Sequence, residues 1–353
     1  MKYIFCILLF LLPGILPAQS RADSMLNFMR SNPAKFAVYL VRNDTVLAKH
    51  NENRKMPLAS TVKILVAVEF AKQAGANVID PEEMVPVSAL DKYYIPFTDG
   101  NAHPMWKQFE ERRGHIKNDS ISLMNVARGM TMFSSNANTD YLIERLGLDN
   151  VNNNTRLFGL KDHTPVYPVV ASLFVYQNPK NRKEEQIIKD IRKLSDEQYA
   201  RFIYGIHMAL RNDTVLKPKF RPMDLTLNMQ RAWSDRLPAS TVRSYAHIAS
   251  SLNNRRYFDQ DTYGVIAEIL EFIMENPANA KWLKHAGMKG GSTNWVLTKT
   301  MYATTKEGNR FELAYFFNDL TQEENNMLSA WMNDFELAIL TRPDFVKKVM
   351  DTW

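Results

Sequence analysis

The sequence has one cysteine, Cys6, so no disulfide bond within the chain can stabilise the fold. Several catalytic motifs are also missing: Gly-x-Ser-x-Gly, His-Glu-x-x-His, the P-loop and Gly-x-Gly-x-x-Gly do not occur. The seven histidines are scattered, so we expect no metal and no cofactor. Only 13 glycines and 16 prolines occur in 353 residues, which excludes collagen-like and linker-dominated chains.

What the sequence does contain is typical of a globular protein. Hydrophobic residues make up 45% and charged residues 23% of the chain, and its length predicts about two domains or one large one. The net charge is +6. Basic and acidic residues alternate between Lys180 and Lys193, which indicates a solvated helix face and no nucleic-acid partner.

The N-terminus has the pattern of a secretory signal peptide. Lys2 precedes an apolar run from Ile4 to Leu16, and small residues follow around Ala18. This run is too short to span a membrane, and we expect no span elsewhere. We therefore predict a signal peptide at residues 1–18 and a periplasmic or secreted protein. Its removal takes away Cys6 and leaves a net charge of +5 (43 minus 38). An uncleaved N-terminal anchor is the alternative.

Hydrophobic periodicity predicts strands at both ends of the chain and helices in the middle. We expect strands at residues 36–41, 45–49, 286–304 and 310–318, helices at 22–30, 60–74, 122–132, 138–146, 239–252, 263–275 and 325–340, and an irregular segment at 76–118. This order predicts an α+β fold, an antiparallel sheet built from both termini with flanking helices and an inserted all-helical domain. The sheet domain would comprise residues 22–80 and 280–353, and the helical domain residues 81–279.

Ser60-Thr61-Val62-Lys63 begins one predicted helix. Residues three apart share a helix face, so Lys63 would lie one turn beyond Ser60. The helix N-terminus favours an oxyanion, and a lysine in a dry site can lose its charge and accept the serine proton. About one such spacing is expected by chance. A capping serine with a solvent-directed lysine is the alternative interpretation.

Ser134-Ser135-Asn136 lies between two predicted helices. A hydroxyl there can relay a proton, and an amide can orient a lysine and bind a substrate carbonyl. Ser-x-Asn also occurs at Ser251 and Ser292, so the pattern is common in this chain. A helix-capping turn is the alternative interpretation.

Lys289-Gly290-Gly291-Ser292-Thr293 is expected to open a strand of the C-terminal pair. Two glycines allow a ligand to approach the strand edge closely. Lys289 supplies a cation, and Ser292 supplies a hydroxyl and a backbone N–H group. A loop-to-strand junction with a bulge is the alternative interpretation.

The order of these motifs and the elements around them resemble the serine β-lactamase and penicillin-binding protein superfamily, closest to its class A β-lactamase-like branch. Residues 54–63, 122–147 and 288–292 carry the resemblance. It implies an α/β-α sandwich of the β-lactamase/transpeptidase type. The resemblance is weak at residues 148–237, which would form a divergent insertion in the helical domain.

The resemblance implies catalytic roles for five residues. Ser60 would be the acylated nucleophile, and Lys63 its general base or proton relay. Ser134 would pass a proton to the leaving nitrogen. Asn136 would hold Lys63 and the substrate amide, and Lys289 would bind a substrate carboxylate.

The resemblance also implies a substrate-binding surface. The N–H groups of the nucleophile and of Ser292 would form the oxyanion hole, beside Gly291 and Thr293. Tyr93 or Tyr94 would wall the cleft, with ordinary packing as the alternative.

Two motif positions depart from the family. Gly290 takes the place of the usual Thr or Ser and lacks a hydroxyl expected to help grip a carboxylate; Ser292 or Thr293 could compensate. Ser135 takes the place of the usual Asp.

A third departure lies between Gly147 and Pro238. Class A β-lactamases carry a Glu-x-x-Leu-Asn loop whose Glu activates the deacylating water, and that motif does not occur here. An acyl-enzyme could then form and persist. Candidates for a replacement base, each alternatively a surface or capping residue, are Asp162, His163, His207 and Asp224.

We therefore predict an exported monomeric serine hydrolase that forms an acyl-enzyme on Ser60. Its partner would be a β-lactam, another small-molecule amide or a peptidoglycan-derived amide. Alternatives are a D-alanyl-D-alanine peptidase-like or esterase-like hydrolase, a slowly deacylating penicillin-binding or sensor protein, or a binding protein that has lost catalysis.

Overall fold

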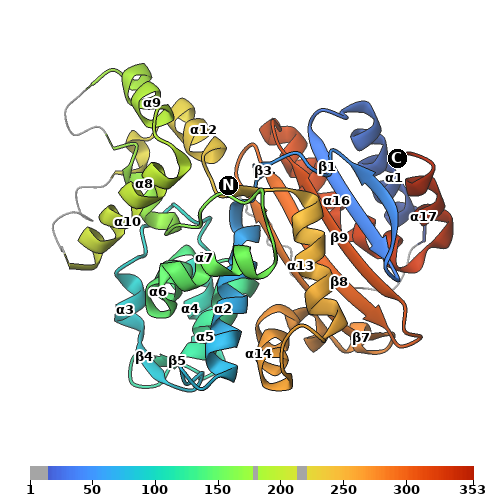
Figure 1. Cartoon of the computed structure of the whole chain (residues 1–353), viewed down its shortest axis with the longest axis horizontal. Coiled ribbons are helices and arrows are strands. Elements are labelled where there is room, and N and C mark those ends of the chain that lie inside the picture. Colours follow the sequence, from blue (N-terminus) through green and yellow to red (C-terminus); the bar gives the residue numbers. More distant parts are fainter. Residues whose placement is uncertain (1–14, 178–181, 213–220) are drawn as a thin grey trace.

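A five-stranded antiparallel sheet joins the two ends of the chain in this computed structural model, which describes residues 15–177, 182–212 and 221–353. The strand order is β2-β1-β9-β8-β7 (Figure 1). The predicted signal peptide lies mostly outside the described residues. The sheet strands are β1 (Phe36–Arg42), β2 (Thr45–His50), β7 (Leu283–Ser292), β8 (Leu297–Thr305) and β9 (Arg310–Phe317).

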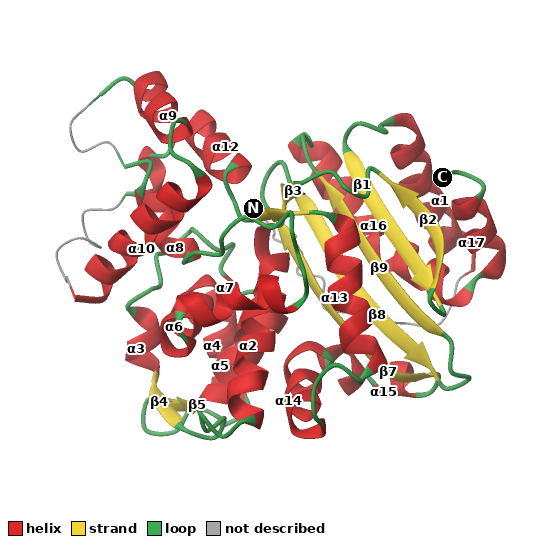
Figure 2. Ribbon diagram, in the orientation of Figure 1, coloured by secondary structure: helices red, strands yellow, loops and turns green. Residues whose placement is uncertain are grey.

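The predicted α+β fold with a sheet from both termini is confirmed. Strand β1 pairs with β9 over its whole length, from Phe36 opposite Phe317 to Arg42 opposite Phe311. Its side chains alternate between the two faces. Phe36 contributes to a core with helices α1 (Ile15–Ser31), α16 (Gln322–Thr341) and α17 (Pro343–Met350), whereas Ala37 faces a core that includes α13 (Val242–Asn254). Helices therefore cover both sheet faces (Figure 2).

The expectation of one strand at residues 286–304 is wrong, because the segment forms a hairpin. Strand β7 ends at Ser292 and β8 begins at Leu297. The Thr293 hydroxyl accepts hydrogen bonds from the backbone N–H groups of Trp295 and Val296, both at 3.2 Å. This side-chain turn reverses the chain without glycine or proline, so it gave no strong turn signal. The glycine-containing motif consequently closes β7 and does not open a strand.

Helix α2 (Lys63–Gly75) lies in the middle of the helical part of the molecule. It is buried on nearly all sides from Lys63 to Ala71 and packs against α5, α6, α7 and α14. The helices of this part are α3 (Val87–Asp91), α4 (Ala102–Arg112), α5 (Leu123–Met132), α6 (Asn136–Leu146), α7 (Leu148–Leu157) and α14 (Gln260–Leu270). Because one core cluster runs from α2 to Phe316 in the sheet, the domain boundaries stay a prediction.

Several elements were not predicted. Residues 76–118 contain α3, α4 and the strand β4 (Met84–Pro86), which pairs with β5 (Ser120–Ser122). The predicted helix 239–252 begins three residues later, after the short strand β6 (Ala239–Ser240), which pairs with β3 (Met56–Pro57). The predicted helix 263–275 divides into α14 and the 3₁₀ turn η3 (Phe272–Glu275), with α15 (Pro277–Ala280) after it.

The first part of the predicted divergent insertion, residues 148–166 with α7, belongs to the core around α2, and the rest carries a second hydrophobic cluster that Ile95 joins. The helices of this second part are α8 (Val169–Phe174), α9 (Glu184–Arg192), α10 (Asp196–Asn212) and α12 (Leu227–Asp235), with the 3₁₀ turn η2 (Pro222–Asp224). Figure 1 shows these helices gathered at one end of the molecule, away from β1 and β2. Within the described part of the chain, no helix has the length and apolar character needed to cross a bilayer.

Truncation of a buried side chain on α2 tests whether this helix lies at the centre of the core. Leu65 has no exposed surface, so Leu65→Ala should lower the free energy of unfolding by about 2–5 kcal/mol. Chemical denaturation measures the change. Val78→Ala, at a position that is 69% exposed, is the control and should change stability by no more than about 0.5 kcal/mol. Equal effects of the two substitutions on the free energy of unfolding would contradict the central place of α2 in the core.

Candidate active site

Ser60 lies at the start of the central helix, as its motif predicts. The first turn is a 3₁₀ segment, η1 (Ala59–Val62), which continues directly into α2 at Lys63. Ala59, immediately before the serine, has a φ of +45°, a conformation that costs free energy for a residue with a Cβ atom. Such local strain is found at functional sites, where the surrounding structure holds it in place.

Lys63 contacts the second motif directly. Its Nζ atom donates hydrogen bonds to the Ser134 carbonyl oxygen at 2.7 Å and to Asn136 Oδ1 at 2.8 Å, and lies 3.3 Å from Ser134 Oγ. The side chain has no exposed surface. The amine of Lys63, in the first motif, is therefore bonded to the turn that forms the second motif.

Burial of this lysine changes its acid–base behaviour. Removal from water lowers the pKa of Lys63 to about 7, although the carboxylates of Asp99 and Asp140 act in the opposite direction. A lysine with a pKa near 7 can accept a proton at physiological pH. The solvent-directed alternative for Lys63 is excluded by its burial.

The lysine of the third motif reaches the same turn from the sheet. Lys289 Nζ donates to Ser134 Oγ at 3.0 Å and to the Gly290 carbonyl oxygen at 2.7 Å. Burial lowers the pKa of Lys289 well below its ordinary value, and the positive charges of Lys63 and Lys299 lower it further. The structure thus joins all three motifs through one hydroxyl group, that of Ser134.

Strand β7 lies directly against the turn that carries Ser60. A Cβ atom added to Gly291 would lie 2.3 Å from the Ser60 nitrogen and 2.8 Å from the Thr61 nitrogen. Thr298 on β8 also binds this turn. Its hydroxyl lies 2.8 Å from Thr61 Oγ1 and donates to the Leu58 carbonyl oxygen at 2.8 Å. The backbones of the first and third motifs meet here, and only glycine fits at position 291.

The remaining residues of the third motif have different surroundings. Ser292 is exposed at the end of β7. The Thr293 hydroxyl lies 2.7 Å from Ser234 Oγ at the end of α12 and forms the turn into β8. It is therefore already engaged, which makes Ser292 the better candidate to compensate for the missing hydroxyl at Gly290.

The two tyrosines predicted beside the cleft have other described contacts. The Tyr93 hydroxyl donates to Glu144, and its ring stacks on His207 with centroids 4.9 Å apart. The Tyr94 ring lies 5.0 Å from that of His103. The burial of Tyr93 favours ordinary packing for this residue. Whether Tyr94 walls the cleft stays a prediction.

The four candidate replacement bases do not occur among the described contacts of the lysine network. Asp162 and Asp224 are exposed. His163 lies 3.1 Å from the Tyr245 hydroxyl, and burial lowers its pKa to about 4. Burial lowers the pKa of His207, which pairs with Glu144 at 3.2 Å. The structure gives none of them a contact with Lys63, Ser134 or Lys289.

Two acidic residues near Lys63 were missed by the sequence analysis. Asp140 is completely buried on α6, and its carboxylate accepts hydrogen bonds from Val169 N at 2.7 Å and Val170 N at 2.9 Å. It fixes the N-terminus of α8 beside the network, and burial raises its pKa. Asp99 accepts a hydrogen bond from His103 N at 3.0 Å. No local sequence pattern marked either residue, because the partners of Asp140 are 29 and 30 positions away and Asp99 lies in the irregular loop before α4.

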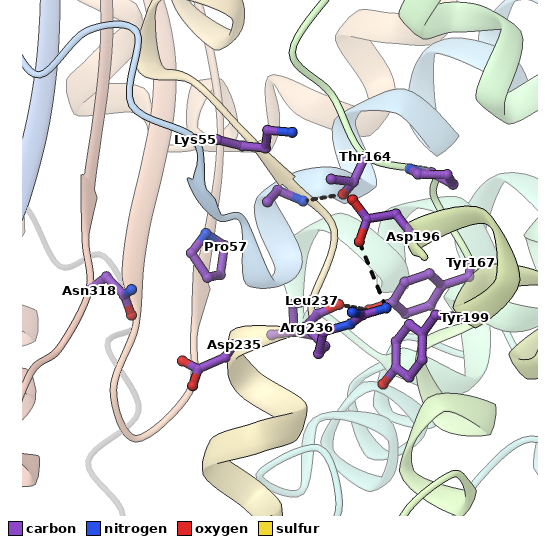
Figure 3. Close-up of a pocket in the computed structure, with 12 residues that line it drawn as sticks. Lys55, Pro57, Thr164, Tyr167, Asp196, Tyr199, Asp235, Arg236, Leu237 and Asn318 are labelled. Carbon is purple, nitrogen blue, oxygen red and sulfur yellow. Dashed lines mark hydrogen bonds and ion pairs between the residues drawn. The ribbon is translucent and has the colours of Figure 1, made fainter. Parts of the chain in front are cut away.

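A cavity of about 400 Å³ lies outside this network, where the insertion leaves the rest of the fold (Figure 3). Lys55, Pro57 and Asn318 line one side, and Asp196 and Arg236 the other. Arg236 pairs with Asp196 at 3.7 Å and donates to backbone carbonyl groups, so its charge is compensated within the protein. The cavity does not include Ser60, Lys63 or Lys289, and we assign no role in catalysis to it. Among the described residues, no cluster of His, Cys, Asp and Glu could hold a metal ion.

The chain belongs to the beta-lactamase enzyme family, whose sequence model matches residues 20–257. No curated protein sequence matches it. Solved structures with a similar fold include the TLA-3 extended-spectrum beta-lactamase, with 15% identity and a TM-score of 0.54, covering 95% of this chain and 98% of that one. The beta-lactamase from Sphaerobacter thermophilus has 16% identity and a TM-score of 0.56, covering 91% and 96%.

A mutant of PBP-A, solved as an acyl-enzyme complex with penicillin G, has the same fold at 14% identity, with a TM-score of 0.51 and coverage of 93% and 99%. The predicted membership of the serine β-lactamase and penicillin-binding protein superfamily is confirmed. Family and fold support a serine hydrolase of the β-lactamase/transpeptidase type.

Substitution of Gly291 tests the contact between β7 and the Ser60 turn. In Gly291→Ala the new methyl group would overlap backbone atoms, so the strand must move away and the reactivity of Ser60 should fall at least about 100-fold. The measurement is the rate of covalent labelling of Ser60 by a fluorescent penicillin.

Gly205→Ala is the control, because a Cβ atom at this helical position meets no atom within 4 Å. It should label at the wild-type rate. A Gly291→Ala protein that also labels at that rate would show that the close approach does not matter for reactivity.

Proposed function

We propose that this protein is an exported serine acyl hydrolase that forms an acyl-enzyme on Ser60 with a β-lactam or a related amide. The observation that carries the proposal is the junction of two buried lysines at the Ser134 hydroxyl, with Lys63 one helical turn from Ser60. A buried lysine with a lowered pKa is suited to remove a serine proton.

Acylation begins with neutral Lys63. It accepts the Ser60 hydroxyl proton as Oγ attacks the carbonyl carbon and the carbonyl oxygen becomes an oxyanion. The backbone N–H groups of Ser60 and Ser292 are proposed to stabilise that oxyanion, an effect of about 3–4 kcal/mol for one donor in other enzymes. The contact of Gly291 with the Ser60 turn supports this arrangement, because it brings the two backbone segments together.

Collapse of the intermediate breaks the carbon–nitrogen bond. The leaving nitrogen takes the Ser134 proton, and Ser134 regains one from protonated Lys63 across the 3.3 Å contact. Lys63 is then neutral again, and the acyl group remains as an ester on Ser60. Asn136 would hold Lys63 and the substrate amide, and Lys289 would bind a substrate carboxylate and bias the Ser134 proton toward the leaving group.

Hydrolysis of the ester needs a base for water, and the family's Glu-x-x-Leu-Asn motif does not occur in this sequence. We infer slow deacylation. A D-alanyl-D-alanine peptidase-like or esterase-like activity is the second candidate. The absence of a side chain at Gly290 reduces recognition of a β-lactam or D-alanine carboxylate alike, so it favours an esterase-like activity on a substrate without that carboxylate.

The decisive test is incubation of the purified mature protein with a fluorescent penicillin while its intact mass is followed. We expect an adduct of one acyl group that persists for minutes to hours, and no adduct in Ser60→Ala. An adduct that turns over within seconds would show efficient lactamase activity. An adduct in Ser60→Ala, or none in the wild type, would overturn the proposed β-lactam reaction.

The pH dependence of acylation tests the role of Lys63. The neutral amine is the reactive form, so the second-order rate constant should rise with pH through a midpoint near 7 and level off above it. Stopped-flow fluorescence between pH 5 and 9.5 measures the profile. A midpoint near 10, the value of an ordinary lysine, would contradict the role of burial.

A further inference from the structure

We propose that His103 is a positioning residue: together with Asp91 it holds Ser135, and thereby keeps the turn of Ser134 and Asn136 against Lys63. The effect of His103 on the reactivity of Ser60 rests on the proposed function. The hydrogen bonds that hold Ser135 do not depend on that proposal.

The three side chains form a continuous hydrogen-bonded chain. His103 Nε2 lies 2.9 Å from Asp91 Oδ1, and His103 Nδ1 lies 3.0 Å from Ser135 Oγ and 3.1 Å from Asn138 Oδ1. His103 is 1% exposed and Ser135 is fully buried, so Ser135 is not itself a second nucleophile open to substrate. The histidine links α3, α4 and α6 at a single point.

Ser135 and Asn138 are bonded to each other as well as to His103. Asn138 Nδ2 donates to the Val126 carbonyl oxygen at 3.1 Å, which turns Asn138 Oδ1 toward Ser135 and His103. Ser135 Oγ accepts from Asn138 N at 3.2 Å and donates to Asn138 Oδ1 at 3.1 Å. His103 meets both ends of this chain, the Asp91 carboxylate through Nε2 and the Ser135 and Asn138 oxygens through Nδ1.

Ser135 in turn fixes the residues on either side of it. It is the N-cap of α6, and its own N–H donates to the Gly129 carbonyl oxygen at 3.3 Å. Ser134 has a φ of +65°, which a serine adopts only when its neighbours hold it there. Lys63 takes three contacts from this turn, so a small shift of Ser135 would weaken all of them together.

The surroundings hold the imidazole in place. His103 packs between the rings of Tyr94 and Trp106, with centroids 5.0 and 5.3 Å away, and its backbone N–H is bound by Asp99. Lys107 donates to Asp91 Oδ2 at 3.0 Å. Burial raises the pKa of Asp91, but the hydrogen bonds from His103 and Lys107 outweigh it and lower the pKa overall, so the carboxylate is charged.

The two ends of the chain differ in burial. The Asp91 side chain is 41% exposed, so water and Lys107 can replace a lost contact there. The Ser135 end has no exposed surface, and a group left without a partner at that end keeps its full desolvation cost. The contact through Nδ1 should therefore matter more than the contact through Nε2.

This asymmetry gives a matched pair of variants. An asparagine amide occupies the place of Nδ1, and a glutamine amide that of Nε2, so His103→Asn keeps the Ser135 contact and His103→Gln keeps the Asp91 contact. We expect His103→Asn to retain acylation by the fluorescent penicillin within about threefold of wild type. His103→Gln should lose about tenfold or more, with unchanged affinity for the probe before acylation.

Hydrogen–deuterium exchange gives a readout that does not depend on activity. The amide of Asn138, bonded to Ser135 Oγ, should exchange about tenfold faster in His103→Gln and near the wild-type rate in His103→Asn. His115→Gln is the control, because His115 also pairs with a carboxylate, Glu110, after the other end of α4. His115→Gln should change neither the acylation rate nor the exchange rate of the Asn138 amide.

Ser135→Ala covers the case in which His103→Gln does not fold. It should slow acylation to a similar degree, and the double variant should lose no more than the single variants do, because both remove one contact. Equal effects of His103→Asn and His103→Gln, or additive losses in the double variant, would overturn the proposal. If the wild type forms no adduct, the proposed function fails while the exchange rates still decide this inference.

Discussion

Two lysine side chains share one serine hydroxyl inside the protein, and much of the site follows from that constraint. Lys63 and Lys289 lie 3.3 and 3.0 Å from Ser134 Oγ, and both are buried. Two ammonium groups so close together, with little water, cannot both keep their charge at an ordinary free energy. The fold therefore surrounds them with carbonyl and amide acceptors, and it places Asp99 and Asp140 nearby. Burial outweighs these groups and lowers the pKa of Lys63 to about 7, so that neutral lysine is available near neutral pH.

The parts of the fold predicted from sequence are those with local signals. Helix periodicity and capping predict α2, α5, α6 and α16, and the order of the three motifs predicts that they meet. The hairpin between β7 and β8 was missed because Thr293 makes the turn with its side chain. Helix α4 was missed because its N-cap residue, Asn101, has a positive φ and makes no side-chain cap; the side chain that accepts a hydrogen bond from its first turn is that of Asp99, two residues earlier.

The site residues beyond the motifs could not be predicted for a different reason. Asp140 acts on residues 29 and 30 positions away, and Thr298 bonds to Thr61 across 237 positions. His103 reaches Ser135 across 32 positions. Contacts of this kind depend on the packing of whole elements, and a single sequence contains no periodic or capping pattern that reports them.

The two ends of the insertion lie beside each other. Thr164 N donates to the Ala239 carbonyl oxygen at 3.0 Å, Ala239 N donates to Thr164 Oγ1 at 2.7 Å, and the Tyr167 hydroxyl donates to the Arg236 carbonyl oxygen at 2.5 Å. The chain thus leaves and re-enters the fold at neighbouring points, with a hydrophobic cluster between them that also includes Ile95. The insertion also reaches the site at two points, through Ser234 beside Thr293 and through the N-terminus of α8, which Asp140 binds. A change in the insertion therefore acts both on the rim of the site and on the surroundings of Lys63.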